Sequence, residues 1–91
     1  MSNLSFEWDE RKSAANAKKH GVSFEEAATS LLDPQSLAQE DDTAAGEARW
    51  VLIGMSTSLR LLTVVYTLRT ADRIRLISAR RATRSEASNY A

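Results

Sequence analysis

The sequence predicts an α+β domain in the order β-α-α-β-β-β-α, with an antiparallel sheet, two N-terminal helices on one sheet face and a C-terminal helix. Helix caps and helical periodicity dominate residues 9–33 and return after residue 83, whereas period-two, β-branched and aromatic residues dominate residues 50–80. Helices segregated in this way from closely linked strands are typical of the α+β class. The length of 91 residues fits one domain, residues 1–91.

The N-terminal part is predicted to form a strand and a helix. Phe6–Trp8 places two aromatic side chains on one face of a short edge strand. Asp9 is a good N-cap for a helix over Glu10–His20, and Gly21 supplies the left-handed residue that ends it.

A second helix is predicted after the S-x-x-E capping box of Ser23 and Glu26. Its buried stripe, at helical spacing, consists of Phe24, Ala27, Ala28 and Leu31. It should end at Asp33-Pro34, because proline disfavours the α conformation of the residue before it. From Gln35 to Ala48 there is no periodicity, so we expect an acidic, mobile surface connection.

Three strands are predicted next, at Trp50–Met55, Leu61–Leu68 and Arg73–Arg80. The connections between them are too short for parallel crossovers, which predicts an antiparallel meander. A second capping box, Thr83 to Glu86, begins a terminal helix whose inner side carries Ala87 and Tyr90.

The charge of the chain is divided between its halves, although the total is zero. Residues 1–48 hold ten acidic and four basic side chains, a net charge of −6, and residues 49–91 hold eight arginines and two acidic side chains, a net charge of +6. The chain has no cysteine, no signal-peptide pattern and no apolar stretch near the roughly twenty residues of a membrane span. We therefore expect a cytoplasmic protein without a membrane partner.

Arginine is concentrated in the third predicted strand and just after it, with five arginines and no lysine in residues 73–84. In a regular strand Arg73 and Arg75 would share a face with Ala79, and Arg80 would lie on the opposite face. One interpretation is a solvated face. The other is a platform for RNA phosphates, because the planar guanidinium fork matches phosphate geometry.

Two further positions are candidates for chemistry. Arg80 and Arg81 precede the final helix, whose N-terminus would favour a phosphate; the alternative is that one of them pairs with Glu25 or Glu26. His20 is the one histidine, and it shares a helix face with Asn16 and Lys19. It is a candidate general acid or base, or else a structural group at the helix end.

Other sites are not indicated. One histidine and scattered carboxylates do not predict a transition-metal site, Glu40-Asp41-Asp42 lacks calcium-loop spacing, and no phosphate loop or nucleophile elbow occurs. We expect no cofactor and no metal. We predict that the aromatic side chains of Trp8, Trp50 and Tyr66 lie in the core. For Trp8 and Tyr66 the alternative is an exposed ring that stacks on an RNA base.

Several stretches together resemble the BrnT family, the toxin half of a bacterial type II toxin–antitoxin pair. In the first half they are residues 6–9, Lys12, Asn16 and residues 19–27. In the second half they are Arg49, residues 51–54, residues 64–67, Arg75, residues 77–80, Ala82-Thr83, Glu86 and Tyr90. The sequence departs from the family at Glu10, where proline is common, and at Leu59, where glycine is frequent before Arg60.

The resemblance implies a RelE-like fold and a metal-independent endoribonuclease that inhibits translation by RNA cleavage. It also implies a BrnA-type ribbon-helix-helix antitoxin and a toxin–antitoxin complex that binds operator DNA. A homodimer of the toxin within that complex is compatible with the resemblance. For this reaction we assign Arg80, Arg75 and His20 as catalytic and Arg73, Arg81 and Lys19 as RNA-binding. The alternatives are a non-catalytic nucleic-acid-binding module and a protein-interaction module.

Overall fold

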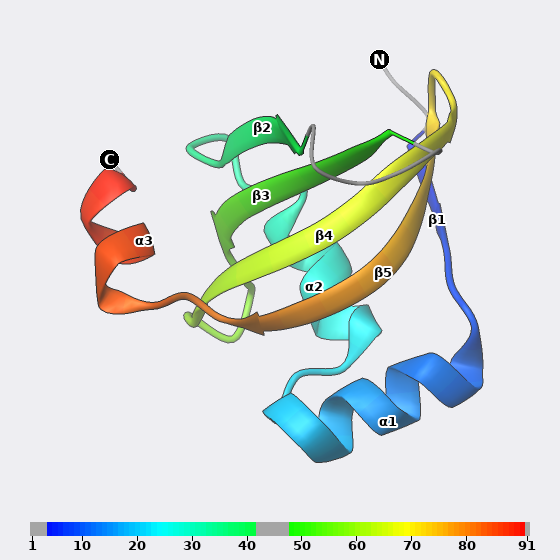
Figure 1. Ribbon diagram of the computed structural model, residues 1–91, viewed down its shortest axis with the longest axis horizontal. Coiled ribbons are helices and arrows are strands. Elements are labelled where there is room, and N and C mark those ends of the chain that lie inside the picture. Colours follow the sequence, from blue (N-terminus) through cyan, green and yellow to red (C-terminus); the bar gives the residue numbers. More distant parts are fainter. Residues whose placement is uncertain (1–3, 42–47, 91) are drawn as a thin grey trace.

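The computed structural model describes residues 4–41 and 48–90, which form a mixed α+β fold with a five-stranded sheet and three helices (Figure 1). In chain order the elements are β1 (Ser5–Glu7), α1 (Glu10–His20), α2 (Phe24–Ser30), β2 (Leu37–Asp41), β3 (Arg49–Met55), β4 (Leu61–Thr70), β5 (Arg73–Arg81) and α3 (Arg84–Asn89).

The sheet has the strand order β1-β5-β4-β3-β2. The antiparallel meander β3-β4-β5 is confirmed. The prediction of a purely antiparallel sheet is wrong, because β1 pairs in parallel with β5, from Ser5 opposite Arg73 to Glu7 opposite Arg75. This pairing is possible because two helices and three strands separate the two segments, which is ample for a crossover.

The segment expected to be a mobile acidic connection contains a strand. β2 pairs antiparallel with β3, from Leu37 opposite Ile53 to Asp41 opposite Arg49, and forms one edge of the sheet. Its side chains are mostly exposed, and an exposed strand needs no apolar face. Leu37–Asp41 therefore shows neither the apolar alternation nor the β-branched composition by which strands are recognised. Residues 42–47 of the same predicted connection lie outside the described residues.

The core lies between the sheet and the two N-terminal helices. Figure 1 shows α2 crossing behind β3, β4 and β5, all of which it contacts, and α1 running along the β5 side. The approach of α2 to β3 is close, since a β-carbon at Gly54 would lie 2.5 Å from the Ser30 carbonyl oxygen. The buried apolar side chains are Val22, Phe24, Ala27, Leu52, Leu62, Val64, Tyr66, Ile74, Leu76 and Ala79.

The aromatic side chains predicted for the core are found there. Tyr66 is buried, and Trp8 and Trp50 are partly buried against the same cluster. Trp8 meets Phe24 edge to face, with ring centroids 6.4 Å apart.

A bulge interrupts β5 at its centre. Val65 lies opposite Ser78 but the next residue, Tyr66, lies opposite Leu76, so Ile77 has no partner on β4. One extra residue in a strand reverses the face of every side chain beyond it.

The bulge overturns the predicted faces of β5. Ala79 is buried in the helix-side core with Ile74 and Leu76, rather than sharing a face with the arginines. Arg80 lies opposite Thr63 and therefore on the other face, since the neighbours of Thr63, Leu62 and Val64, are fully buried in the core. Arg73, Arg75 and Arg80 consequently share the face away from α1 and α2.

Helix ends follow the predicted caps, with two corrections at α2. Asp9 caps α1, and the Ser23 hydroxyl accepts from the Glu26 amide at 3.1 Å. The carboxylate of Glu26 bonds Ser56 and Arg60 instead of closing a capping box. The helix also ends at Ser30, before Asp33-Pro34, with Leu31 as its C-cap.

The terminal helix α3 has the complete capping box of Thr83 and Glu86. No residue of α3 is buried, and Ala87, predicted for its inner side, is exposed. Its attachment to the rest of the fold is polar: Glu86 accepts from Thr63 of β4 at 2.8 Å, and the Tyr90 hydroxyl donates to Asp33 in the connection between α2 and β2.

Candidate nucleic-acid interface

A groove runs between α1 and the bulge of β5. Its volume is about 260 Å³, and its lining residues are Lys12, Ala15, Asn16, Lys19, His20, Ile77 and Ser78. The α1 residues recur at helical spacing and so share the side of the helix that faces the strand. The groove therefore gathers two lysines and the chain's one histidine at an irregular point of the sheet edge.

Asn16 attaches α1 to this edge. Its side-chain nitrogen donates to the carbonyls of Val22 at 2.8 Å and Ala79 at 2.7 Å, and its oxygen accepts from the Ala79 amide at 3.2 Å. The side-chain amide thus completes both backbone bonds of Ala79 at a point of β5 beyond its pairing with β1. The sequence predicted that Asn16 shares a helix face with Lys19 and His20, but it did not predict the bonds to Ala79.

Arg80 is held by α3. Its two terminal nitrogens donate to the two carboxylate oxygens of Glu86, both at 2.8 Å, and one of them also donates to the Arg81 carbonyl at 3.2 Å. The bond to Arg80 is the main reason that the pKa of Glu86 falls to about 2, and the same pair raises the pKa of Arg80. The Arg80 side chain remains 42% exposed.

Arg73 and Arg75 meet at Glu7 of β1. Arg75 donates to the Glu7 carboxylate at 2.9 Å and Arg73 at 3.4 Å, while Arg69 lies 3.6 Å from it. Hydrogen bonding from Arg75, followed by that from Arg73, lowers the pKa of Glu7. Three guanidinium groups around one carboxylate leave this end of the strand with a local excess of positive charge.

Arg81 is exposed at the end of β5. The alternative considered for Arg80 and Arg81, a hydrogen-bonded pair with Glu25 or Glu26, is wrong for Arg80, which bonds Glu86. It is Arg60 that bonds Glu26, and that bond is the first cause of the lowered pKa of Glu26, to which the charge of Arg81 adds a smaller contribution.

Apart from Arg81, which is exposed at the end of β5, the predicted site residues fall into three groups. Lys19 and His20 lie together in the groove. Arg75 lies two residues before the bulged Ile77 and Arg80 three residues after it, about 7 Å and about 10 Å along the strand. Arg73 lies farther along β5 towards its start, beside Glu7.

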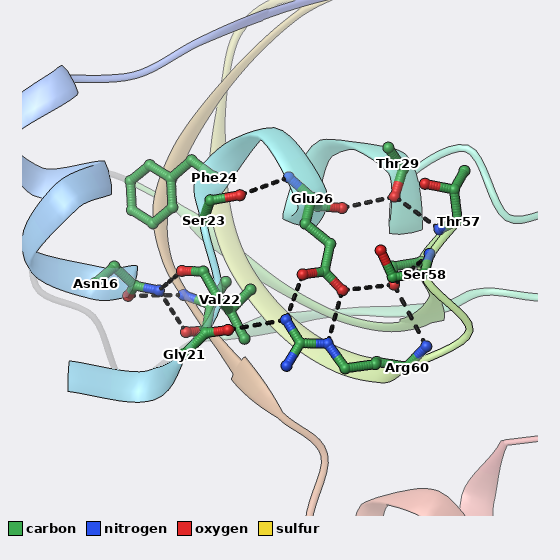
Figure 2. A network of polar contacts seen from close by, with 12 residues as sticks. Asn16, Gly21, Val22, Ser23, Phe24, Glu26, Thr29, Thr57, Ser58 and Arg60 are labelled. Carbon is green, nitrogen blue, oxygen red and sulfur yellow. Dashed lines mark hydrogen bonds and ion pairs between the residues drawn. The ribbon is translucent and has the colours of Figure 1, made fainter. Parts of the chain in front are cut away.

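Sequence reasoning missed the network around Arg60, which Figure 2 shows from close by. Arg60 donates to Glu26 at 2.9 Å and to the carbonyl of Gly21 at 2.8 Å, and the Ser56 hydroxyl donates to Glu26 at 2.7 Å. The one available signal was an arginine at the end of a predicted turn, which by itself does not identify a partner in α2.

The described part of the chain offers neither a metal-ligand cluster nor a membrane-spanning helix. Residues 4–41 and 48–90 contain no group of three or more histidine, cysteine, aspartate or glutamate side chains placed to hold a metal ion. None of the helices in these ranges is long and apolar enough to cross a membrane.

Comparison with known proteins assigns the chain to the ribonuclease toxins of type II toxin–antitoxin systems. The profile of the family described as "Ribonuclease toxin, BrnT, of type II toxin-antitoxin system" matches residues 8–86. The chain belongs to the BrnT family, and the resemblance found in the sequence is confirmed.

A solved structure gives the same result. The Brucella abortus ribonuclease toxin BrnT, known from a crystal structure, shares 26% sequence identity with this chain. The two structures superpose with a TM-score of 0.65, over 90% of this chain and 100% of the Brucella chain. No curated protein matches this chain significantly.

Proposed function

We propose that the chain is a metal-independent endoribonuclease that cleaves RNA at the groove between α1 and β5 and thereby inhibits translation. The observation that carries the proposal is the set of side chains around the β5 bulge: Lys12, Lys19 and His20 line the groove, and Arg75 and Arg80 lie before and after the bulge on the other face of the same strand. These side chains can bind the phosphates on either side of a scissile bond.

The proposed reaction is an internal transesterification. The 2′-oxygen of the RNA forms a bond to the adjacent phosphorus while the bond from phosphorus to the 5′-oxygen breaks, which leaves a 2′,3′-cyclic phosphate and a 5′-hydroxyl. One proton leaves the 2′-hydroxyl and one is added to the 5′-oxygen. His20 is proposed for one of these transfers, since an imidazole nitrogen can accept or donate a proton, and water serves the other.

Arg80 is proposed to stabilise the negative charge that develops on the phosphate. A guanidinium has five N–H donors. Glu86 and the Arg81 carbonyl take three of them, and within the described part of the chain the Nε–H and the second Nη2–H have no partner. These two donors lie on one side of the fork, the arrangement that binds a phosphate with two parallel bonds.

The remaining assigned residues are proposed to hold the RNA backbone. Arg75 is the second candidate for charge stabilisation, and Arg73 and Arg81, at the two ends of β5, are proposed to bind phosphates farther along the RNA. Lys19 binds a phosphate from the α1 side of the groove.

Purified protein should cleave RNA, and Arg80→Ala should reduce the cleavage rate by roughly 10²- to 10³-fold, the usual effect of removing one transition-state donor. His20→Ala should also lower the rate. Arg84→Gln is the matched control, because Arg84 is exposed, begins α3 and has no role in the proposal. Full activity of Arg80→Ala would refute the assignment, while salt-dependent RNA binding without cleavage would favour a non-catalytic binding module.

The toxin class implies an antitoxin partner. We propose a BrnA-type antitoxin with a ribbon-helix-helix domain, whose complex with the toxin binds operator DNA in the cytoplasm, and a complex that can contain two toxin copies. An adjacent reading frame with a ribbon-helix-helix pattern whose product co-purifies with this chain is the expected result. The absence of such a reading frame, or a product that does not bind this chain, would count against the proposal. The mass of the complex gives the number of toxin copies in it.

A further inference from the structure

The end of α1 that carries Lys19 and His20 is closed by a residue with little intrinsic restraint. Gly21 has a φ of 74°, and apart from Gly21 itself and its neighbours in the chain no heavy atom of the described residues lies within 4 Å of the point where a β-carbon would be. Its amide donates to the Ala17 carbonyl at 2.8 Å, as in many helix ends that finish in the left-handed conformation. Packing at Gly21 therefore does not hold this end in place.

Arg60 reaches this end from the β3–β4 hairpin. Its Nε and Nη2 donate to the two carboxylate oxygens of Glu26, which fixes the plane of the guanidinium (Figure 2). The second Nη2–H then points to the Gly21 carbonyl oxygen, at 2.8 Å. The Ser56 hydroxyl donates to the same Glu26 oxygen as Nε, at 2.7 Å, and so helps to hold the carboxylate.

Asn16 holds the other end of the same helical turn. Its bonds to Ala79 attach α1 to β5 next to the bulge, and its bond to Val22 attaches it to the residue after Gly21. The segment from Ala17 to His20 is therefore fixed at both ends, by Asn16 on the β5 side and by Arg60 on the hairpin side. Both groove residues, Lys19 and His20, belong to this segment.

We infer that Arg60 and Glu26 are positioning residues for RNA cleavage, which act by holding the Gly21 carbonyl and with it the orientation of Lys19 and His20. The inference rests on the proposed function. Neither residue lines the groove, so their effect passes through the end of α1. Misplacement of a catalytic group by about 1 Å can reduce a rate by roughly 10²-fold, even when the change is made at a distance.

The test combines cleavage kinetics with amide hydrogen exchange on the full chain, for wild type, Arg60→Gln, Arg60→Lys and the Arg84→Gln control. Arg60→Gln should lower kcat by about 10-fold or more with KM within about 3-fold, because Arg73 and Arg81, which are proposed to bind the RNA backbone, lie outside the end of α1. Exchange should accelerate at the amides of Lys19, His20 and Gly21 but not at Leu62 and Val64 in the core. Arg60→Lys, whose ammonium can donate to Glu26 and to Gly21, should restore part of the rate.

Each outcome decides a separate question. Equal kcat in wild type and Arg60→Gln, or unchanged exchange at residues 19–21, would overturn the positioning role while leaving RNA cleavage standing. Wild-type protein that does not cleave RNA would overturn the proposed function, and the positioning role with it. If Arg60→Gln does not fold, the same measurements on Glu26→Gln test the positioning role, since this variant keeps the shape of the carboxylate but removes the charge that orients Arg60. Full activity of Glu26→Gln with slow amide exchange at residues 19–21 would again overturn the inference.

Discussion

Replacement of Asn16 by alanine should strongly destabilise the protein. The Asn16 side chain is buried, with 9% of its surface exposed, and makes three hydrogen bonds to the backbone of Val22 and Ala79. Each lost bond costs about 1 kcal/mol net, and buried backbone groups left without a partner add to this. We expect a loss of about 3 kcal/mol, a large part of the roughly 5–14 kcal/mol typical of a chain of this length.

Urea unfolding followed by circular dichroism measures this loss, with Lys18→Ala as the control on the exposed side of α1. The control should change the free energy of unfolding by less than about 0.5 kcal/mol. Asn16→Asp places a carboxylate against two carbonyl oxygens, so it should be least stable near neutral pH and recover as the carboxyl is protonated. A loss below about 1 kcal/mol for Asn16→Ala would refute the idea that Asn16 attaches α1 to β5.

Three further predictions concern the hairpin, the helix–sheet contact and α3. Leu59 has a φ of 63° and is 83% exposed. Leu59→Gly should raise the free energy of unfolding by about 0.5–1 kcal/mol, because relief of the left-handed strain outweighs the added entropy of the unfolded chain. Leu59→Ala, which keeps the strain, is the control. Gly54→Ala should lower it by about 1–3 kcal/mol in denaturation experiments, because the new β-carbon would overlap the Ser30 carbonyl, and a smaller loss would mean that α2 shifts freely. The Glu86 pKa of about 2, lowered from 4.5, stabilises the protein above pH 4.5, and this contribution is lost as pH falls towards 2. With solvent screening of a partly exposed pair it amounts to about 1 kcal/mol, so wild type and Glu86→Gln should differ at pH 6 and converge near pH 2; a constant difference would contradict this reasoning.

The helices and the meander were predictable because their signals are local. Asp9 and Gly21 limit α1, and the β-branched segments of residues 50–80 became strands within one or two residues of their predicted ends. β2 was missed because an edge strand is held by its backbone pairing, and backbone groups are the same in every sequence. The parallel pairing of β1 with β5 likewise depends on a contact between the two ends of the chain.

The candidate site could be predicted in its residue types but not in its arrangement. Lys19 and His20 share a groove, as their spacing on one helix face suggests. The partners of the arginines were not predictable: Glu86 holds Arg80 across the turn between β5 and α3, and Glu7 holds Arg75 through the pairing of β1 with β5. The bulge at Ile77, which separates Ala79 from the arginine face, leaves no signal in a strand where neither predicted face is apolar.

The sequence by itself determined the three helices, four of the five strands, the family, and the concentration of arginine near residue 80. Caps, periodicity and composition act over a few residues, so they can be recognised without the fold. Tertiary structure decided which face each arginine occupies, which carboxylate it meets, and how Asn16 and Arg60 fix the end of α1. These contacts join residues up to 68 positions apart, and their energies depend on geometry that forms only when the sheet does.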